Sequence, residues 1–170
     1  MKPWIPALLL VLAAPSAAQQ HQHNHGPYAG MHVRAIKSLS EQQIAELRAG
    51  KGMGLALAAE LNGYPGPLHV LELADKLNLS APQTLRLKQA YEAMKAEAIA
   101  TGDKLIESEA ALDREFAAQK MTPARLAFLT AQIGEHQGAL RAVHLKYHLS
   151  TAELLSTEQK QRYSALRGYR

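Results

Sequence analysis

Two histidines in the second half of the chain, His144 and His148, stand four residues apart. On a helix this spacing places both imidazole rings on one face, about one turn apart and within reach of a single metal ion. Imidazole nitrogens are common ligands of zinc, copper and nickel. The alternative interpretation is structural, because His144 lies beside Leu140 and Tyr147 and is then a histidine packed at the edge of a core.

Three further histidines, His21, His23 and His25, alternate with other residues in a polar stretch that offers no apolar face. We expect this stretch to be disordered, so that its flexible backbone lets the three imidazoles wrap around one ion. A polar leader without any metal function is the other interpretation. The chain requires no cofactor in either case, and where an ion binds we expect a divalent metal such as zinc, copper or nickel.

The absence of cysteine limits the remaining chemistry. The 170 residues contain Cys 0, which excludes a thiol nucleophile, a disulfide and any cysteine-ligated zinc or iron–sulfur site. A metal must therefore be held by histidine, carboxylate or methionine. No serine, histidine and aspartate stand in the strand–turn–helix context of a hydrolase, and we expect a protein that is not an enzyme.

The charge of the chain is only modestly basic. Lys and Arg number 19 against 15 Asp and Glu, a net charge of +4. The basic residues are not clustered, so this excess is no electrostatic footprint for nucleic acid. We expect no nucleic-acid partner.

Helices must position these side chains. Hydrophobic residues make up 47% of the chain but aromatic ones only 5%, so the apolar content is mostly alanine and leucine. This composition favours an all-α fold, in which helices pack on helices.

A local pattern, Leu-Ser-x-x-Gln, occurs three times and predicts three helix starts. Serine at the N-cap accepts a hydrogen bond from the backbone of the third helical residue, and glutamine at that residue reaches back to the N-cap N–H. The helices should begin after the serine of each copy. The copies are Leu39, Ser40 and Gln43; Leu79, Ser80 and Gln83; and Leu155, Ser156 and Gln159.

Two long apolar seams follow the second copy. Apolar residues recur at intervals of three and four over residues 81–119 and again over residues 124–150, with Thr122 and Pro123 starting the second run. Two long helices joined by so short a turn predict an antiparallel helical hairpin. Shorter helices are expected to flank it, over residues 53–61, 68–77 and 157–166.

The expected hairpin also predicts neighbours for the histidines. If the chain turns near Met121, His148 faces Met94, and His144 faces Glu97 or Ala98. A cluster of two histidines, a glutamate and a methionine would suit a borderline or soft metal.

The N-terminus resembles a secretory signal. Lys2 precedes an apolar run over residues 4–14, which is too short to span a bilayer, and Ser16 and Ala18 supply the small residues that signal peptidase requires. Cleavage after about Ala18 would deliver the chain to the periplasm without a stable membrane anchor, with a net charge of +3 because Lys2 is lost. An uncleaved anchor is the alternative. We therefore expect a signal peptide at 1–18, a disordered His-rich leader at 19–37 and one all-helical domain at 38–170.

A hairpin of two helices leaves apolar surface uncovered, so we expect a homodimer. The alternative is a monomer in which the short helices fold back and complete the bundle.

The Leu-Ser-x-x-Gln copies, the export signal, the lack of cysteine and the expected hairpin together resemble the LTxxQ-motif family of bacterial periplasmic proteins. This family includes Spy-like and CpxP-like stress chaperones and metal-resistance proteins. Serine here replaces the usual threonine of the motif, a change that helix capping tolerates. Residues 50–67 have no counterpart in the resemblance, and their role stays open.

The resemblance implies an ATP-independent chaperone or envelope-stress protein whose partners are unfolded or misfolded periplasmic proteins. The alternative function is periplasmic metal binding for heavy-metal resistance or sensing, through His144 and His148 with Met94 and Glu97, or through the histidine tail.

Overall fold

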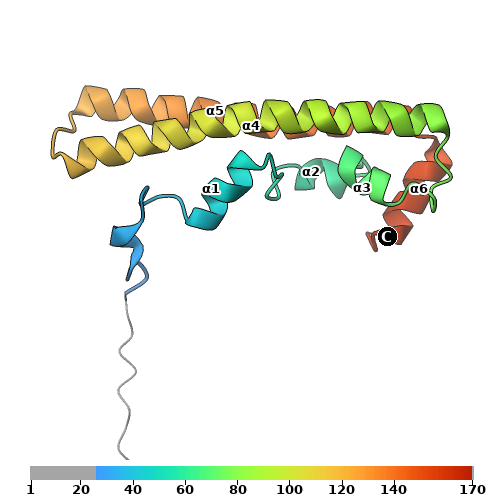
Figure 1. The fold of residues 1–170 in the computed structure, drawn as a ribbon, viewed down its shortest axis with the longest axis horizontal. Helices are drawn as coiled ribbons and strands as arrows, with labels where there is room; N and C mark the ends of the chain where they lie inside the picture. The colour runs from blue at the N-terminus through green and yellow to red at the C-terminus, as the bar shows by residue number, and fades with distance from the viewer. Residues whose placement is uncertain (1–25, 170) are drawn as a thin grey trace, which may run out of the picture.

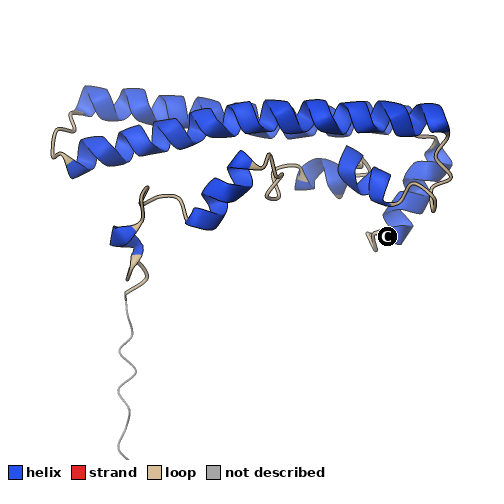
Figure 2. Cartoon of the chain, viewed as in Figure 1, coloured by secondary structure: helices blue, strands red, loops and turns tan. Residues whose placement is uncertain are grey.

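A computed structural model describes residues 26–169 of the chain. The expected signal peptide and the tail histidines His21, His23 and His25 lie outside the described residues. Within residues 26–169 the secondary structure is entirely helical (Figure 2). None of the helices in this part of the chain is both long and apolar enough to cross a membrane.

The helices lie close to the positions expected from the sequence, and the long ones match best. In chain order they are the 3₁₀ helix η1 (Met31–Val33) and the α-helices α1 (Glu41–Arg48), α2 (Leu57–Glu60), α3 (Pro67–Glu72), α4 (Ala81–Ala117), α5 (Pro123–Leu154) and α6 (Thr157–Leu166).

The two short helices α2 and α3 are shorter than expected. Met53 and Gly54 both have positive φ, 43° and 81°, so residues 53–56 form turns and α2 starts only at Leu57. After Glu72 the chain continues in tight turns, in which the N–H of Leu73 donates to the carbonyl of Val70 at 3.1 Å. Propensity alone does not detect these local changes.

All three predicted capping boxes are confirmed. Ser40, Ser80 and Ser156 are the N-caps of α1, α4 and α6, and each serine side chain accepts from the backbone N–H of its glutamine. Each glutamine side chain in turn accepts from the N–H of its serine. The motif therefore starts three helices by satisfying backbone donors that would otherwise be left without partners.

The long helices α4 and α5 pack against one another along most of their length, and residues 118–122 join them at one end (Figure 1). Helices α1, α2, α3 and α6 all lie on one side of this long helix pair in that view. The short helices therefore form an incomplete second layer.

Two hydrophobic clusters hold this layer to the long helix pair. The first cluster joins α1 to the middle of α4 and α5. The second joins α3 and α6 to the N-terminal part of α4, around Leu87. The leading leucines of the motif pack into these clusters: Leu39 against the first, and Leu79 and Leu155 in the second. The buried members of the first are Ile36, Leu47, Ala98, Leu105, Ile106, Ile133 and Leu140; those of the second are Val70, Leu77, Leu87, Leu155 and Tyr163.

The glutamines of the second and third motif copies also bind each other. Gln83 Nε2 donates to Gln159 Oε1 at 2.8 Å, and Gln159 Nε2 donates to Gln83 Oε1 at 3.2 Å. The same two amides donate to the carbonyls of Leu154 and Leu77, which precede the two helix starts. The two capping boxes therefore form one reciprocal contact that joins the start of α4 to the start of α6.

Residues 36–38, at the boundary expected between the leader (19–37) and the helical domain (38–170), contact α4 and the first cluster. Ile36 is buried in the first cluster, and Lys37 Nζ lies 3.0 Å from Asp113 Oδ2. Ser38 Oγ donates to Glu109 Oε2 at 2.7 Å. One apolar residue and two polar contacts thus attach residues 36–38 to α4.

Candidate functional site: a histidine-lined cavity

A cavity of about 310 Å³ lies between α5 and the segment of residues 50–67, whose role the sequence left open. Its walls come from α2, α3, α4, α5 and the C-terminal residues that follow α6. It contains both His144 and His148. The lining residues are Gly52, Met53, Gly54, Ala56, Leu57, Glu60, Gly66, Pro67, Leu68, His69, Met94, His144, His148, Arg167 and Tyr169.

His144 is buried, with 2% of its surface exposed, and its Nε2 atom has no hydrogen-bond partner within residues 26–169. Its Nδ1 atom lies near Gly52, and a Cβ atom added to Gly52 would lie 3.7 Å from this nitrogen. Burial, and secondarily the charge of His148, hold the pKa of His144 below its usual range. At neutral pH the ring is therefore uncharged and presents a lone pair. The packed-histidine interpretation accounts for its burial but leaves the unpartnered nitrogen unexplained, because buried polar groups are nearly always paired.

His148 is fixed from both sides. Its Nδ1 lies 2.7 Å from the carbonyl oxygen of Tyr64 and 3.5 Å from Glu60 Oε2. Because both of these oxygens only accept, Nδ1 carries the proton, and in the neutral ring Nε2 has the free lone pair. This Nε2 atom lies next to Gly66, and a Cβ atom added to Gly66 would lie only 2.8 Å from it. Glycine is therefore required at position 66 by the close approach of the imidazole.

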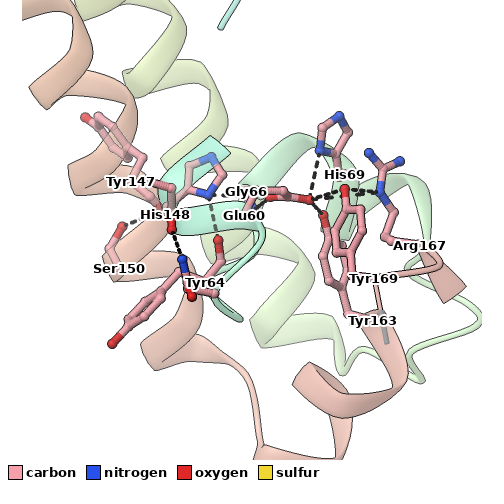
Figure 3. A network of polar contacts seen from close by, with 12 residues as sticks. Glu60, Tyr64, Gly66, His69, Tyr147, His148, Ser150, Tyr163, Arg167 and Tyr169 are labelled. Carbon is pink, nitrogen blue, oxygen red and sulfur yellow. Dashed lines mark hydrogen bonds and ion pairs between the residues drawn. The ribbon is translucent and has the colours of Figure 1, made fainter. Parts of the chain in front are cut away.

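Glu60 is the centre of a buried polar network, which Figure 3 shows. Only 6% of Glu60 is exposed. Its Oε1 accepts from the hydroxyls of Tyr163 and Tyr169, and its Oε2 accepts from the N–H of Gly66 at 3.1 Å. His69 Nδ1 lies 3.6 Å from Oε1. The carboxylate thus joins α2, α3, α5 and the C-terminus at one point.

The C-terminal side chains complete this network. Burial, and then the hydrogen bond to Glu60, raise the pKa of Tyr163 far above its usual range, so its hydroxyl stays protonated and donates. Arg167 Nε donates to the Tyr169 hydroxyl at 3.1 Å and lies 3.9 Å from Glu60 Oε1. This hydrogen bond is also the main reason that the pKa of Arg167 is raised. Glu60 therefore remains an acceptor with both oxygens occupied.

Of the side chains that the sequence placed together, the structure brings three to the cavity and separates one. His144, His148 and Met94 all line it. Glu97 does not, because Lys146 Nζ lies 2.6 Å from its Oε2 and the Tyr147 hydroxyl donates to its Oε1 at 2.7 Å. The predicted register of α4 against α5 thus places Met94 near the two histidines, but the carboxylate of Glu97 contacts Lys146 and Tyr147 of α5 and does not line the cavity.

The hydrogen bonds from Lys146 and Tyr147 lower the pKa of Glu97. Burial, followed by the hydrogen bond to Glu97, raises the pKa of Tyr147 to about 12. Glu97 therefore forms a polar contact between α4 and α5, and it is not available to the cavity. Over residues 26–169, no group of three or more His, Asp or Glu side chains is arranged to hold a metal ion.

Sequence reasoning did not find Glu60, Gly66 or the C-terminal tyrosines. They lie far apart in the chain, in elements without a long apolar period, and only packing against α5 brings them to His148. Another histidine of α5, His136, lies with its Nδ1 2.9 Å from Ser108 Oγ. It takes no part in the cavity.

Five large apolar side chains on and beside α2 and α3 are exposed. We call these five residues the apolar rim. Three of them, Met53, Leu57 and Leu68, also line the cavity itself. The apolar rim consists of Met53, Leu57, Leu61, Tyr64 and Leu68, which are between 38% and 55% exposed.

No family model matches this chain, and no curated protein or solved structure shows significant similarity to it. The resemblance to the LTxxQ-motif family thus stays an expectation from the sequence.

Proposed function

We propose that this protein is an exported, ATP-independent chaperone that binds unfolded or misfolded proteins in the periplasm. The observation that carries the proposal is the apolar rim, five large exposed side chains on and beside the short helices α2 and α3. Exposed apolar side chains that gather on one part of a protein surface can form a binding site for another protein. The short helices α2 and α3 have few backbone hydrogen bonds of their own, so the rim can adapt to different clients.

The test is an aggregation assay on a chemically denatured client, with the chain purified from residue 19 and no nucleotide added. We expect the parent protein to suppress light scattering when it is present in equal amounts with the client. Leu57→Asp combined with Leu68→Asp should remove most of this activity, because charge in the rim opposes apolar contacts.

Leu85→Asp is the matched control, because Leu85 is an equally exposed leucine on α4, away from the rim. It should suppress aggregation as well as the parent does, and circular dichroism should show the same helix content in all three proteins. Equal activity of the rim variant and the parent would contradict the proposal.

We further propose that the long helix pair is an antiparallel hairpin that dimerises. Support comes from Phe116, Phe128 and Leu149, three side chains of the long helices that are each more than half exposed. A second copy would remove these side chains from water. Sedimentation velocity over a hundredfold range of concentration should show a dimer that dissociates on dilution, and a monomer at every concentration would exclude it.

Metal binding in the histidine cavity is a second candidate function, and a separate observation favours it. His144, whose Nε2 has no hydrogen-bond partner among the described residues, lines the same cavity as His148 and Met94. Calorimetric titration with zinc, copper and nickel should therefore give a binding event that His144→Ala with His148→Ala abolishes. If the double variant gives the parent isotherm, any binding belongs to the histidine tail.

A further inference from the structure

We propose that the end at which α4 and α5 are joined is a membrane-binding surface, which inserts apolar side chains into a bilayer rich in anionic phospholipids. We call this end, residues 114–128, the joined end. Such a surface goes beyond the chaperone and metal-binding functions proposed above and depends on neither of them. Three features of the joined end support it: its lack of cover, its apolar side chains and its charge.

The joined end is a part of the long helix pair that the second layer leaves uncovered. Lys37 Nζ, before α1, lies 3.0 Å from Asp113 Oδ2. From Arg114 to Phe128 no residue is buried, whereas Leu129, the next residue of α5, is only 1% exposed. In Figure 1 this end of the pair, drawn in yellow and orange, extends past η1 and α1. Two helices and the turn between them thus form the joined end.

Both phenylalanines of the chain lie in the joined end. The sequence has Phe 2, and these are Phe116 in the last turn of α4, which is 56% exposed, and Phe128 in the second turn of α5, which is 52% exposed. Leu126 is a third large apolar side chain there, and it is 38% exposed. Phenylalanine and leucine are among the residues that proteins bury at the boundary between lipid headgroups and acyl chains.

The charge of the joined end is positive. Three basic residues, Arg114, Lys120 and Arg125, stand against one acid, Glu115. Arg125 is engaged, because its Nε lies 3.0 Å from Glu115 Oε1 and its guanidinium lies 5.5 Å from the centre of the Phe128 ring. Across residues 26–169 the side chains of Arg114 and Lys120 have no ion pair or hydrogen bond. Their long stems can lie on an apolar surface while the charged groups reach phosphates.

This combination favours an anionic lipid surface over a second copy of the chain. The dimer proposed above would cover the same two phenylalanines, but two joined ends that meet would bring like charges together. An anionic bilayer takes up the apolar side chains and attracts the basic ones at the same time. A protein partner with an acidic surface is the other occupant that the experiment must separate from lipid.

The experiment is flotation of the chain from residue 19 with lipid vesicles. One set of vesicles is phosphatidylcholine alone, and the other contains about one third phosphatidylglycerol. The buffer is at about pH 8, so that the histidine tail is uncharged. We expect partition onto the anionic vesicles to be at least tenfold stronger, and high salt should reduce this difference because it screens the attraction.

A pair of variants tests the apolar side chains. Phe116→Ser combined with Phe128→Ser should weaken binding to anionic vesicles at least tenfold. Leu85→Ser combined with Leu149→Ser is the matched control, because these leucines of α4 and α5 are 58% and 52% exposed and lie outside the joined end. The control should bind as the parent does, and circular dichroism should show equal helix content in all three proteins.

A second pair tests the charge. Arg114→Gln combined with Lys120→Gln should remove most of the preference for anionic vesicles. The matched control is Arg86→Gln combined with Lys88→Gln, an exposed arginine and an exposed lysine near the other end of α4. This control should keep the preference of the parent.

Insertion can be measured directly, because the chain has Cys 0 and a single cysteine can be labelled. Ala118→Cys is exposed in the joined end and should carry an environment-sensitive fluorophore whose emission shifts to the blue on anionic vesicles. Gln161→Cys, exposed on α6, should show no such shift.

Several results would overturn this assignment. They are no partition of the parent onto anionic vesicles, equal binding by the phenylalanine variant, and no blue shift at position 118. Sedimentation velocity of the same proteins identifies a second copy as the occupant, if the phenylalanine variant is a monomer, the parent is a dimer and vesicles bind neither. Loss of vesicle binding with unchanged suppression of client aggregation would separate the joined end from the chaperone function.

Discussion

The histidine cavity contains a residue whose position is costly for the fold. A buried polar atom without a partner costs on the order of 1–3 kcal/mol, and His144 Nε2 is such an atom. Such groups are few in folded proteins, and a ligand, an ion or an ordered water often accounts for them. The most informative measurements at the scale of single residues are therefore those that compare stability with binding at position 144.

His144→Leu should stabilise the metal-free protein. Leucine fills a similar space and leaves no unsatisfied nitrogen, so we expect the free energy of unfolding to rise by about 1 kcal/mol. Urea denaturation followed by circular dichroism, in the presence of a chelator, measures this change. A variant that unfolds at a lower urea concentration than the parent would mean that the imidazole contributes to packing in the absence of any ligand.

Glu97 and Tyr147 give a pH-dependent prediction. Burial and Glu97 raise the pKa of Tyr147 from 10.0 to about 12. Because the folded-state pKa lies above the unfolded one, this contribution to stability is complete below about pH 10 and is lost as the pH rises toward 12. In Glu97→Gln the pKa of Tyr147 should fall. Subtracting the tyrosinate absorbance of a Tyr147→Phe variant isolates this titration, and an unchanged midpoint would argue against the contact.

At the scale of elements, the three copies of the motif share one local role and differ in tertiary role. Gln83 and Gln159 cap their own helices and also bind each other. Gln43 makes both contacts of its own capping box, but across the described residues its amide nitrogen has no hydrogen bond to a distant element. The same five-residue pattern thus caps one helix locally in the first copy, whereas the second and third copies also bind each other.

Gln83→Ala should therefore destabilise the protein more than Gln43→Ala. Both variants lose a capping box, which costs about 1 kcal/mol, but Gln83→Ala also loses hydrogen bonds to α6 and leaves the amide of Gln159 short of a partner. We expect a difference of about 1–2 kcal/mol in thermal or urea unfolding. A double-mutant cycle with Gln159→Ala should show coupling between the two glutamines, and strict additivity would contradict the reciprocal contact.

We predict opposite effects on stability when alanine replaces two glycines that lie inside the long helices. At Gly102 in α4, an added Cβ would come within 3.0 Å of the Leu47 carbonyl oxygen of α1, whereas at Gly138 in α5 nothing lies within 4 Å. Gly138→Ala should stabilise the protein by about 0.5–1 kcal/mol through helix propensity. Gly102→Ala should destabilise it, because α1 must move away. Melting temperatures that shift in the same direction for both variants would exclude this packing of α1.

At the scale of the whole molecule, the second layer of helices is attached at two separate places. The first cluster reaches back to Ile36, and the second holds α3 and α6 at the opposite end of α4. The cavity lies against the second layer, and its walls include residues that are far apart in the sequence, from Gly52 to Tyr169. Its shape thus depends on the complete fold.

Ile36 tests where the folded unit begins. Ile36→Ala should lower the free energy of unfolding by about 2 kcal/mol, because it removes a buried isoleucine side chain from the first cluster. Val33→Ala is the control, because Val33 is 76% exposed and its truncation should change stability little. If both variants unfold like the parent, the contact of residue 36 with α4 makes no energetic contribution.

The sequence by itself determined the helices and their starts. Three capping boxes, the Thr122-Pro123 start and the alternating apolar seams fix α1, α4, α5 and α6, because capping and amphipathic periodicity act within a few residues along the chain. The pairing of His144, His148 and Met94 was also predictable, since it follows from the register of the two long seams.

Tertiary structure alone decided what surrounds those three side chains. Glu97 or Ala98 was expected to face His144, and in the structure the carboxylate of Glu97 binds Lys146 and Tyr147. Glu60 comes instead from a four-residue helix, and it meets His148 only because Gly66 permits a close approach. Periodicity specifies which face of a helix is buried, but partners that are distant in sequence are selected by packing, where a small rotation or one missing Cβ decides the contact.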